Sequence, residues 1–181
     1  MARYALILAA FAGFVLSAAS GIVIVPFLHK LHFGQTIKEI GPTWHNKKQG
    51  TPTMGGLCFI FAGTVAVALA TLSLLHSAPD MLGGPTARSL YIAMFSAFAF
   101  GMVGFLDDFV KVVKKRNLGL RPMQKIVAQL LITTALLVAL HMNGTLTTWV
   151  TLPLVGYVDL GLLYYPLSYG LIIGIVNAVN L

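Results

Sequence analysis

The sequence predicts an all-α fold: a polytopic bundle of transmembrane helices that forms one integral membrane domain over residues 1–181. Composition supports this prediction, because 57% of the residues are hydrophobic and only 9% are charged. Soluble domains carry about 25% charged residues, so this chain has too little polar surface to cover a water-facing globule. The apolar residues also fall into long uncharged runs, which is typical of a protein that lies in a bilayer.

Five apolar runs are long enough to cross a membrane, since about 20 helical residues span its hydrocarbon core. They predict spans near residues 4–28, 55–75, 90–106, 126–142 and 162–181. The first run begins like a signal peptide, with Arg3 before the apolar stretch and Ala18-Ala19-Ser20 within it. The run continues past that point through Val25, so we expect a retained helix rather than a cleaved leader.

The lysines and arginines are distributed unequally between the connections, which predicts the side of the membrane that each connection faces. Only Arg3 and Arg88 lie on one side, and all the others lie in segments 29–54 and 107–125: Lys30, Lys38, Lys47, Lys48, Lys111, Lys114, Lys115, Arg116, Arg121 and Lys125. We therefore expect both segments to face the cytoplasm and the N-terminus to lie outside. These short basic blocks lack interleaved aromatic residues, so no nucleic-acid partner is expected despite a formal net charge of +7.

We expect the segments on the outer side to have structural rather than catalytic roles. Residues 77–86 are rich in proline and glycine and predict turns. Residues 147–159 contain alternating valine, leucine and tyrosine around Pro153 and Gly156, which predicts a short β-hairpin on the outer surface. Asp159 should cap a turn or the start of the fifth helix. The single cysteine, Cys58, lies inside an apolar run, so we expect a buried thiol and no disulfide within the chain.

Two adjacent carboxylates, Asp107 and Asp108, stand at the expected cytoplasmic end of the third span. Lys111 lies four residues after Asp107 and three residues after Asp108, so ion pairs within the helix would account in part for the two acids. A cytoplasmic membrane boundary needs only positive charge, however, so a functional role is favoured. Adjacent helical residues point about 100° apart. One carboxylate could then approach a divalent cation or an attacking group while lysine holds the other, and Lys111, Lys114 and Lys115 would suit an anionic substrate.

Two further regions contain candidate binding residues. Glycine and threonine around Pro52 predict a tight turn, whose free N–H groups at the start of the second span make an anion site. His45, Lys47 and Lys48 could add positive charge, although a plain Gly-Pro connection is the alternative. Asn177 and Asn180 lie on one face of the fifth span, and they either bind a substrate or bond to neighbouring helices.

Three motifs resemble those of the phospho-N-acetylmuramoyl-pentapeptide transferase family, within the polyprenyl-phosphate N-acetylhexosamine-1-phosphate transferases. The first runs from Gly41-Pro-Thr-Trp-His45 through Lys48-Gln-Gly-Thr-Pro-Thr-Met-Gly-Gly56. The second is Gly104-Phe-Leu-Asp-Asp-Phe-Val-Lys111, which continues to Lys115 and then to Gln124-Lys125. The third is the opening of a motif, Asn177-Ala-Val-Asn-Leu181. Their order and spacing cover essentially the whole chain.

The resemblance implies a magnesium-dependent reaction in a bacterial cytoplasmic membrane, with the active face towards the cytoplasm. UDP-MurNAc-pentapeptide and undecaprenyl phosphate would give lipid I and UMP, the first membrane step of peptidoglycan synthesis. Asp107 and Asp108 would be catalytic and are both candidate metal ligands. Asp107 matches the residue proposed in the family to deprotonate the lipid phosphate; we expect it to orient the nucleophile and Asp108 to hold the metal or its shell, and a covalent phospho-aspartate route stays open. The implied substrate-binding residues are His45, Lys48, Thr51, Thr53, Lys111, Lys115, Lys125, Asn177 and Asn180.

The resemblance also implies ten spans, of which this sequence would supply five, and a homodimer is a further expectation. The chain stops inside the fifth span without a helix stop signal, so we expect it to be truncated and inactive alone. The main metal ligand of the family is expected beyond Leu181.

Two alternatives remain. One is a related transferase that uses UDP-GlcNAc, which the Thr51-Pro-Thr-Met-Gly-Gly56 run disfavours. The other is a fragment of a transporter or a scaffold without catalysis. Transporters place charges at the membrane midplane, whereas this chain gathers them in two connecting segments.

Overall fold

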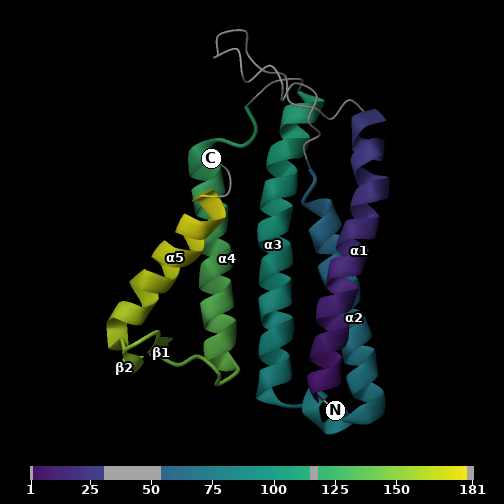
Figure 1. Cartoon of the computed structure of the whole chain (residues 1–181). Coiled ribbons are helices and arrows are strands. Elements are labelled where there is room, and N and C mark those ends of the chain that lie inside the picture. Colours follow the sequence, from purple (N-terminus) through teal and green to yellow (C-terminus); the bar gives the residue numbers. More distant parts are fainter. Residues whose placement is uncertain (1, 31–53, 115–117, 179–181) are drawn as a thin grey trace. The chain divides into compact units, whose positions relative to one another are not determined.

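The computed structural model describes residues 2–30, 54–114 and 118–178. Five helices within these ranges are long and apolar enough to cross a membrane, which confirms the predicted fold class. The α-helices are α1 (Ala2–Lys30), α2 (Leu57–Ser77), α3 (Pro85–Val113), α4 (Pro122–Met142) and α5 (Tyr164–Ala178), with short 3₁₀ turns η2 (Pro79–Leu82) and η3 (Gly161–Leu163) (Figure 1). The fifth candidate span, Gly161–Ala178, consists of η3 and α5 together. The chain forms two compact units: 1–84 with 101–121, and 85–100 with 122–181.

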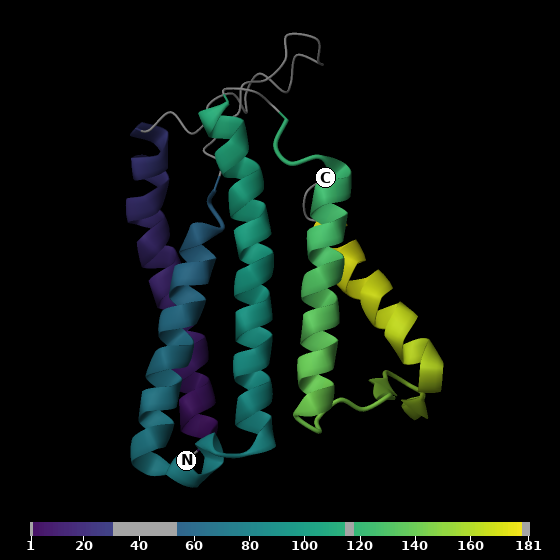
Figure 2. The same ribbon diagram turned by 180° about the vertical axis from the view of Figure 1, so that it is seen from behind.

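In the first unit, α1 and α2 pack antiparallel along a seam of small residues. The two ribbons lie side by side in both views (Figures 1 and 2). Ser20 approaches the carbonyl of Cys58 at 3.4 Å, and a Cβ added at Gly13 would lie 3.6 Å from that of Ala66. Cys58, Ala62 and Ala66 are buried in this seam. Small side chains let two helix backbones approach closely where no hydrophobic effect drives them together. The expected burial of the Cys58 thiol is confirmed.

The second unit is built around α4, with α5 packed antiparallel to it. Thr134 and Tyr169 share a hydrogen bond of 2.7 Å across this pair. The first turns of α3 also belong here, because the Asn143 amide donates to the Pro85 carbonyl at 2.7 Å and to the Ser89 hydroxyl at 3.0 Å. Both α3 and α4 begin with proline, whose missing N–H costs nothing in the first helical turn.

The predicted hairpin is present between α4 and α5. Strands β1 (Trp149–Leu152) and β2 (Gly156–Asp159) pair antiparallel, with Trp149 opposite Asp159. Asp159 accepts hydrogen bonds from the Thr148 hydroxyl and, at 2.9 Å, from the Gly161 N–H. It therefore caps the turn that leads into η3 and α5, as the sequence predicts.

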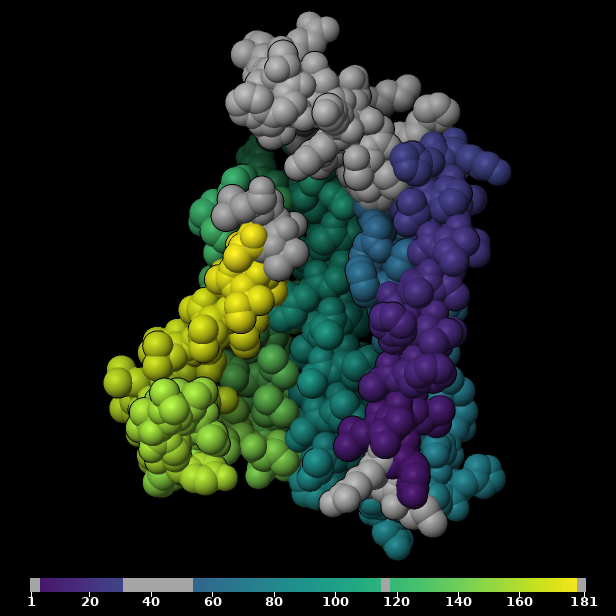
Figure 3. Space-filling view, in the orientation of Figure 1, coloured from purple at the N-terminus to yellow at the C-terminus, as the bar shows by residue number. Residues whose placement is uncertain are grey.

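Large apolar side chains cover the outside of the helices. Phe11, Phe14, Phe59, Phe95 and Leu131 are all more than half exposed, and Figure 3 shows the side chains of α1 uncovered on one face. Such surfaces suit lipid rather than water. Helix α3 continues beyond Leu106, where the sequence placed the end of its span, so the acid pair lies within its last turns.

Candidate functional site

The last two turns of α3 hold the adjacent acids and present them differently. The Asp107 side chain is turned inward and is 10% exposed, whereas that of Asp108 is 27% exposed. The difference follows from the helix itself, because successive residues point about 100° apart. Asp107 is therefore placed against the protein, and Asp108 is the more accessible of the two.

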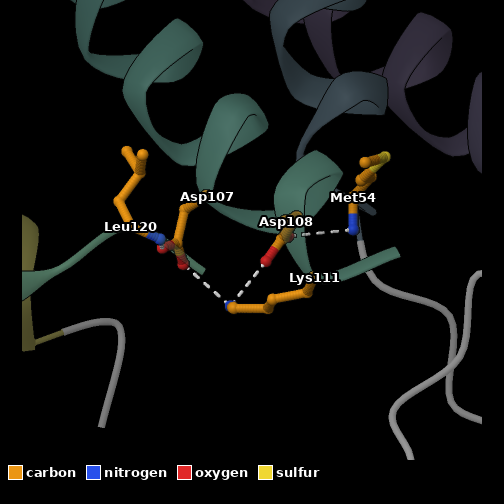
Figure 4. A network of polar contacts seen from close by, with 5 residues as sticks. All are labelled: Met54, Asp107, Asp108, Lys111 and Leu120. Carbon is orange, nitrogen blue, oxygen red and sulfur yellow. Dashed lines mark hydrogen bonds and ion pairs between the residues drawn. The ribbon is translucent and has the colours of Figure 1, made fainter. Parts of the chain in front are cut away.

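Lys111 bridges both carboxylates from one turn further along α3. Its Nζ lies 2.8 Å from Asp107 Oδ2 and 2.8 Å from Asp108 Oδ1 (Figure 4). This is the i+4 and i+3 pairing that the sequence predicts. One ammonium group serves two carboxylates, so these three side chains together carry excess negative charge.

The segment that enters α2 supplies a second donor. The Met54 N–H donates to Asp108 Oδ2 at 3.3 Å. Met54 is buried and has a φ of +69°, a left-handed conformation that non-glycine residues seldom adopt. The turn expected around Pro52 lies outside the described residues, but the Met54 N–H that follows it binds an anion of the chain itself, the Asp108 carboxylate.

Residues 118–121, which precede α4, lie against Asp107. The Leu120 N–H donates to Asp107 Oδ1 at 2.8 Å (Figure 4). Gly119 makes this approach possible, because a Cβ there would lie 2.2 Å from Asp107 Oδ1 and 2.5 Å from the Asp107 carbonyl oxygen. Any larger residue at position 119 would have to move away from the carboxylate.

All four carboxylate oxygens of the acid pair accept a hydrogen bond or an ion pair from the chain. No group of three histidine, cysteine or acidic side chains able to hold a metal occurs among residues 2–30, 54–114 and 118–178. Mg²⁺ is usually held by one or two carboxylates together with waters and substrate phosphates, so Asp107 and Asp108 could supply only part of its ligands. Together with Lys111 they form a charged cluster at the C-terminal end of α3.

Many of the predicted binding residues lie outside the described ranges: His45, Lys48, Thr51, Thr53, Lys115 and Asn180. Of the others, Lys111 is in the cluster described above. Lys125 is half-buried in the first turn of α4, and Asn177 lies in α5, so both belong to the second unit.

Asn177 makes a reciprocal amide pair with Gln129 of α4. Its Nδ2 donates to Gln129 Oε1 at 2.8 Å, while Gln129 Nε2 faces Asn177 Oδ1 at 3.4 Å. Asn177 also donates to the Ile173 carbonyl at 2.8 Å. Gln129 is only 2% exposed. Asn177 therefore makes a hydrogen bond to a neighbouring helix, which is one of the two roles that the sequence predicts for it.

Three groups in the site were not predicted from the sequence: the Met54 N–H, the Leu120 N–H and Gly119. Two are backbone donors, which no side-chain pattern reveals. Gly119 falls in a glycine-containing connection between two helices, where a turn is the simplest interpretation.

Comparison with known families identifies the chain. The model of glycosyl transferase family 4 matches residues 90–181, and phospho-N-acetylmuramoyl-pentapeptide-transferase signature 1 matches residues 48–60. The first match contains Asp107, Asp108 and Lys111, and the second contains Met54. The residues that meet at the C-terminal end of α3 therefore come from both matched regions.

Several curated relatives bear the name phospho-N-acetylmuramoyl-pentapeptide-transferase. One from Heliobacterium modesticaldum is 42% identical and is matched over 93% of this chain and 50% of its own length. Relatives from Clostridium perfringens and Halalkalibacterium halodurans are 39% and 38% identical, over 97% and 100% of this chain and 50% and 53% of their own length. The chain spans about half the length of the curated relatives it matches. It belongs to glycosyl transferase family 4 and, within that family, to the phospho-N-acetylmuramoyl-pentapeptide-transferases.

Proposed function

We propose that the protein carrying this chain transfers phospho-MurNAc-pentapeptide from UDP-MurNAc-pentapeptide to undecaprenyl phosphate, giving lipid I and UMP. The observation that carries the proposal is the contact between Met54 and Asp108. It brings the signature region and the acid pair of α3 together in one unit. A scaffold would have no use for two carboxylates held in this way at a helix end.

The proposed reaction needs little proton transfer. A phosphate monoester has a second pKa near ~6, so the lipid phosphate is largely dianionic at neutral pH. One of its oxygens attacks the β-phosphorus of the nucleotide sugar, and the bond from that phosphorus to the oxygen bridging the two phosphates breaks. UMP leaves with that oxygen, so charge and atoms balance without a strong base. Catalysis of this kind is chiefly positioning and electrostatic stabilisation.

The cluster on α3 would serve this chemistry through its fixed charges. Lys111 is positioned to neutralise phosphate oxygens beside Asp108, the more exposed acid. Further cations for the diphosphate of the nucleotide sugar would come from Lys48, Lys115 and Lys125. Mg²⁺ belongs to the proposal through the family resemblance, with Asp107 or Asp108 as the carboxylate that would hold it beside the substrate phosphates.

The substrate assignment is tested with the longest natural polypeptide that carries this sequence. The purified protein receives undecaprenyl phosphate, Mg²⁺ and either radiolabelled UDP-MurNAc-pentapeptide or radiolabelled UDP-GlcNAc, and the organic phase is counted. We expect label in the lipid from the first donor only. Lipid label from UDP-GlcNAc alone would favour the related transferases. We also expect the 181 residues alone to be inactive, because they span about half the length of the curated relatives.

We further propose a bacterial cytoplasmic membrane location, with the N-terminus outside and segments 29–54 and 107–125 inside. The distribution of lysine and arginine supports this orientation. Lys48→Cys and Gly83→Cys, each in a Cys58→Ala background, are labelled in intact cells with a membrane-impermeant maleimide. Labelling at position 83 but not at 48 is expected, and the opposite pattern would reverse the orientation.

We also propose a homodimer, which is tested by the mass of the purified protein in detergent.

A further inference from the structure

The connection after α3 makes a contact with Asp107 that the proposed reaction does not require. A carboxylate acting as a general base needs an oxygen that can reach the substrate. The Leu120 N–H instead occupies Asp107 Oδ1 at 2.8 Å, and Lys111 occupies Oδ2 at 2.8 Å. The side chain is also the less exposed of the two acids.

The geometry at Gly119 shows how tightly this contact is built. A Cβ at this position would fall 2.2 Å from Asp107 Oδ1, 2.7 Å from its Cγ and 2.5 Å from its carbonyl oxygen. Two of these three atoms belong to a side chain fixed by Lys111, and the third is helix backbone, so the obstruction is not the flexible end of a side chain. Only glycine permits the connection to lie this close to the helix.

We infer that Gly119 is a positioning residue, an inference that rests on the proposed function. Gly119 lets the Leu120 N–H bind the Asp107 carboxylate, and this hydrogen bond is called the clamp below. The clamp fixes Asp107, Asp107 holds Lys111, and Lys111 holds Asp108 at 2.8 Å. Asp107 therefore acts through its neighbours, and Asp108 is the acid presented to the substrate. Fixed charges need no reorganisation during the reaction, which is why such support raises turnover.

Gly119→Ala in the longest natural form of the chain tests the inference through activity. The clash displaces the connection, so kcat for lipid-linked product should fall about 10-fold or more while KM for the nucleotide sugar changes less than about 3-fold. Gly83→Ala is the matched control, because Gly83 lies in a connection, has an ordinary φ and has nothing within 4 Å of its added Cβ. Equal kcat in the two variants would overturn the inference.

Amide hydrogen exchange at Leu120 tests the clamp without any assay of activity. Asp107→Ala removes the acceptor, so exchange at Leu120 should accelerate about 10-fold or more. Asp107→Asn retains a carbonyl acceptor at Oδ1 and should keep the protection, and Asp108→Ala should keep it as well. Unchanged exchange in Asp107→Ala would disprove the clamp. If the exchange results hold but no variant makes lipid-linked product, the clamp stands and the proposed function fails.

Discussion

The two units of the chain each contain a part-buried polar network, and the two networks differ in charge. At the end of α3, two carboxylates share the Lys111 ammonium group, and each also accepts a hydrogen bond from a backbone N–H. Between α4 and α5, the amides of Gln129 and Asn177 satisfy each other, with no ionised group in the pair.

This difference separates a network for chemistry from one for assembly. A neutral reciprocal pair holds two helices in register and is complete once they pack. The α3 cluster gathers ionised side chains at one helix end, and such clusters are frequent where a charged ligand or a reaction makes use of them. Substitutions in the first network should therefore change turnover, and substitutions in the second should change stability.

The largest effect should come from the acid pair. Asp107→Asn and Asp108→Asn keep the side-chain shape but remove charge, so each should lower turnover by about 10²-fold or more with little change in folding. Product formation per mole of folded protein is the measurement. Rates close to wild type in both variants would mean that the α3 network has a structural role, like the pair of Gln129 and Asn177.

Lys111→Ala should have a smaller but specific effect. Removing the ammonium group leaves two carboxylates without their shared partner and takes a cation away from the diphosphate. Affinity for UDP-MurNAc-pentapeptide should fall about 10-fold, measured by calorimetric titration. Arg88→Ala, which removes a cation near the start of the same helix, is the control. Equal affinities in the two variants would contradict a role for Lys111 in binding.

Gln129→Leu should act on stability instead. It leaves the Asn177 amide without its partner on α4, which costs about 1–2 kcal/mol in the free energy of unfolding. Asn177→Leu should cost a similar amount, and the double variant should cost less than the sum of the two. Thermal unfolding in detergent measures all three. Additive losses would mean that the two amides do not stabilise the protein as a pair.

The smallest effect concerns Asp159 in the hairpin. Hydrogen bonds from the Thr148 hydroxyl and the Gly161 N–H lower the pKa of this carboxyl below its usual 3.8. The ionised form is the one bonded, so its contribution to hairpin stability is present above pH ~3.8 and is lost as the pH falls through the lowered pKa. A carboxyl ¹³C titration should show the lowered pKa, and Thr148→Val should raise it again. No difference between the two proteins would exclude the bond to Thr148.

The sequence was most informative where a pattern repeats. The five helices follow from long apolar runs, and the hairpin follows from valine, leucine and tyrosine around the turn residues Pro153 and Gly156. The ion pairs of Lys111 follow from helical spacing alone. The clamp on Asp107 did not follow, because Leu120 contributes only its backbone N–H and Gly119 contributes only the lack of a side chain. The partner of Asn177 could not be found either, since pairing it with Gln129 requires knowing how α4 and α5 align.

The most direct test of the account is the fate of the β-phosphate. UDP-MurNAc-pentapeptide labelled with ³²P at that position is given to the longest natural form of the chain with undecaprenyl phosphate and Mg²⁺. Transfer of a sugar phosphate predicts that the label enters the lipid phase with the wild-type protein and with Gln129→Leu, and that it stays in water with Asp108→Asn. A lipid-linked sugar formed while the ³²P remains in soluble UDP would contradict the proposed chemistry. Undiminished transfer by Asp108→Asn would contradict the assignment of this chemistry to the C-terminal end of α3.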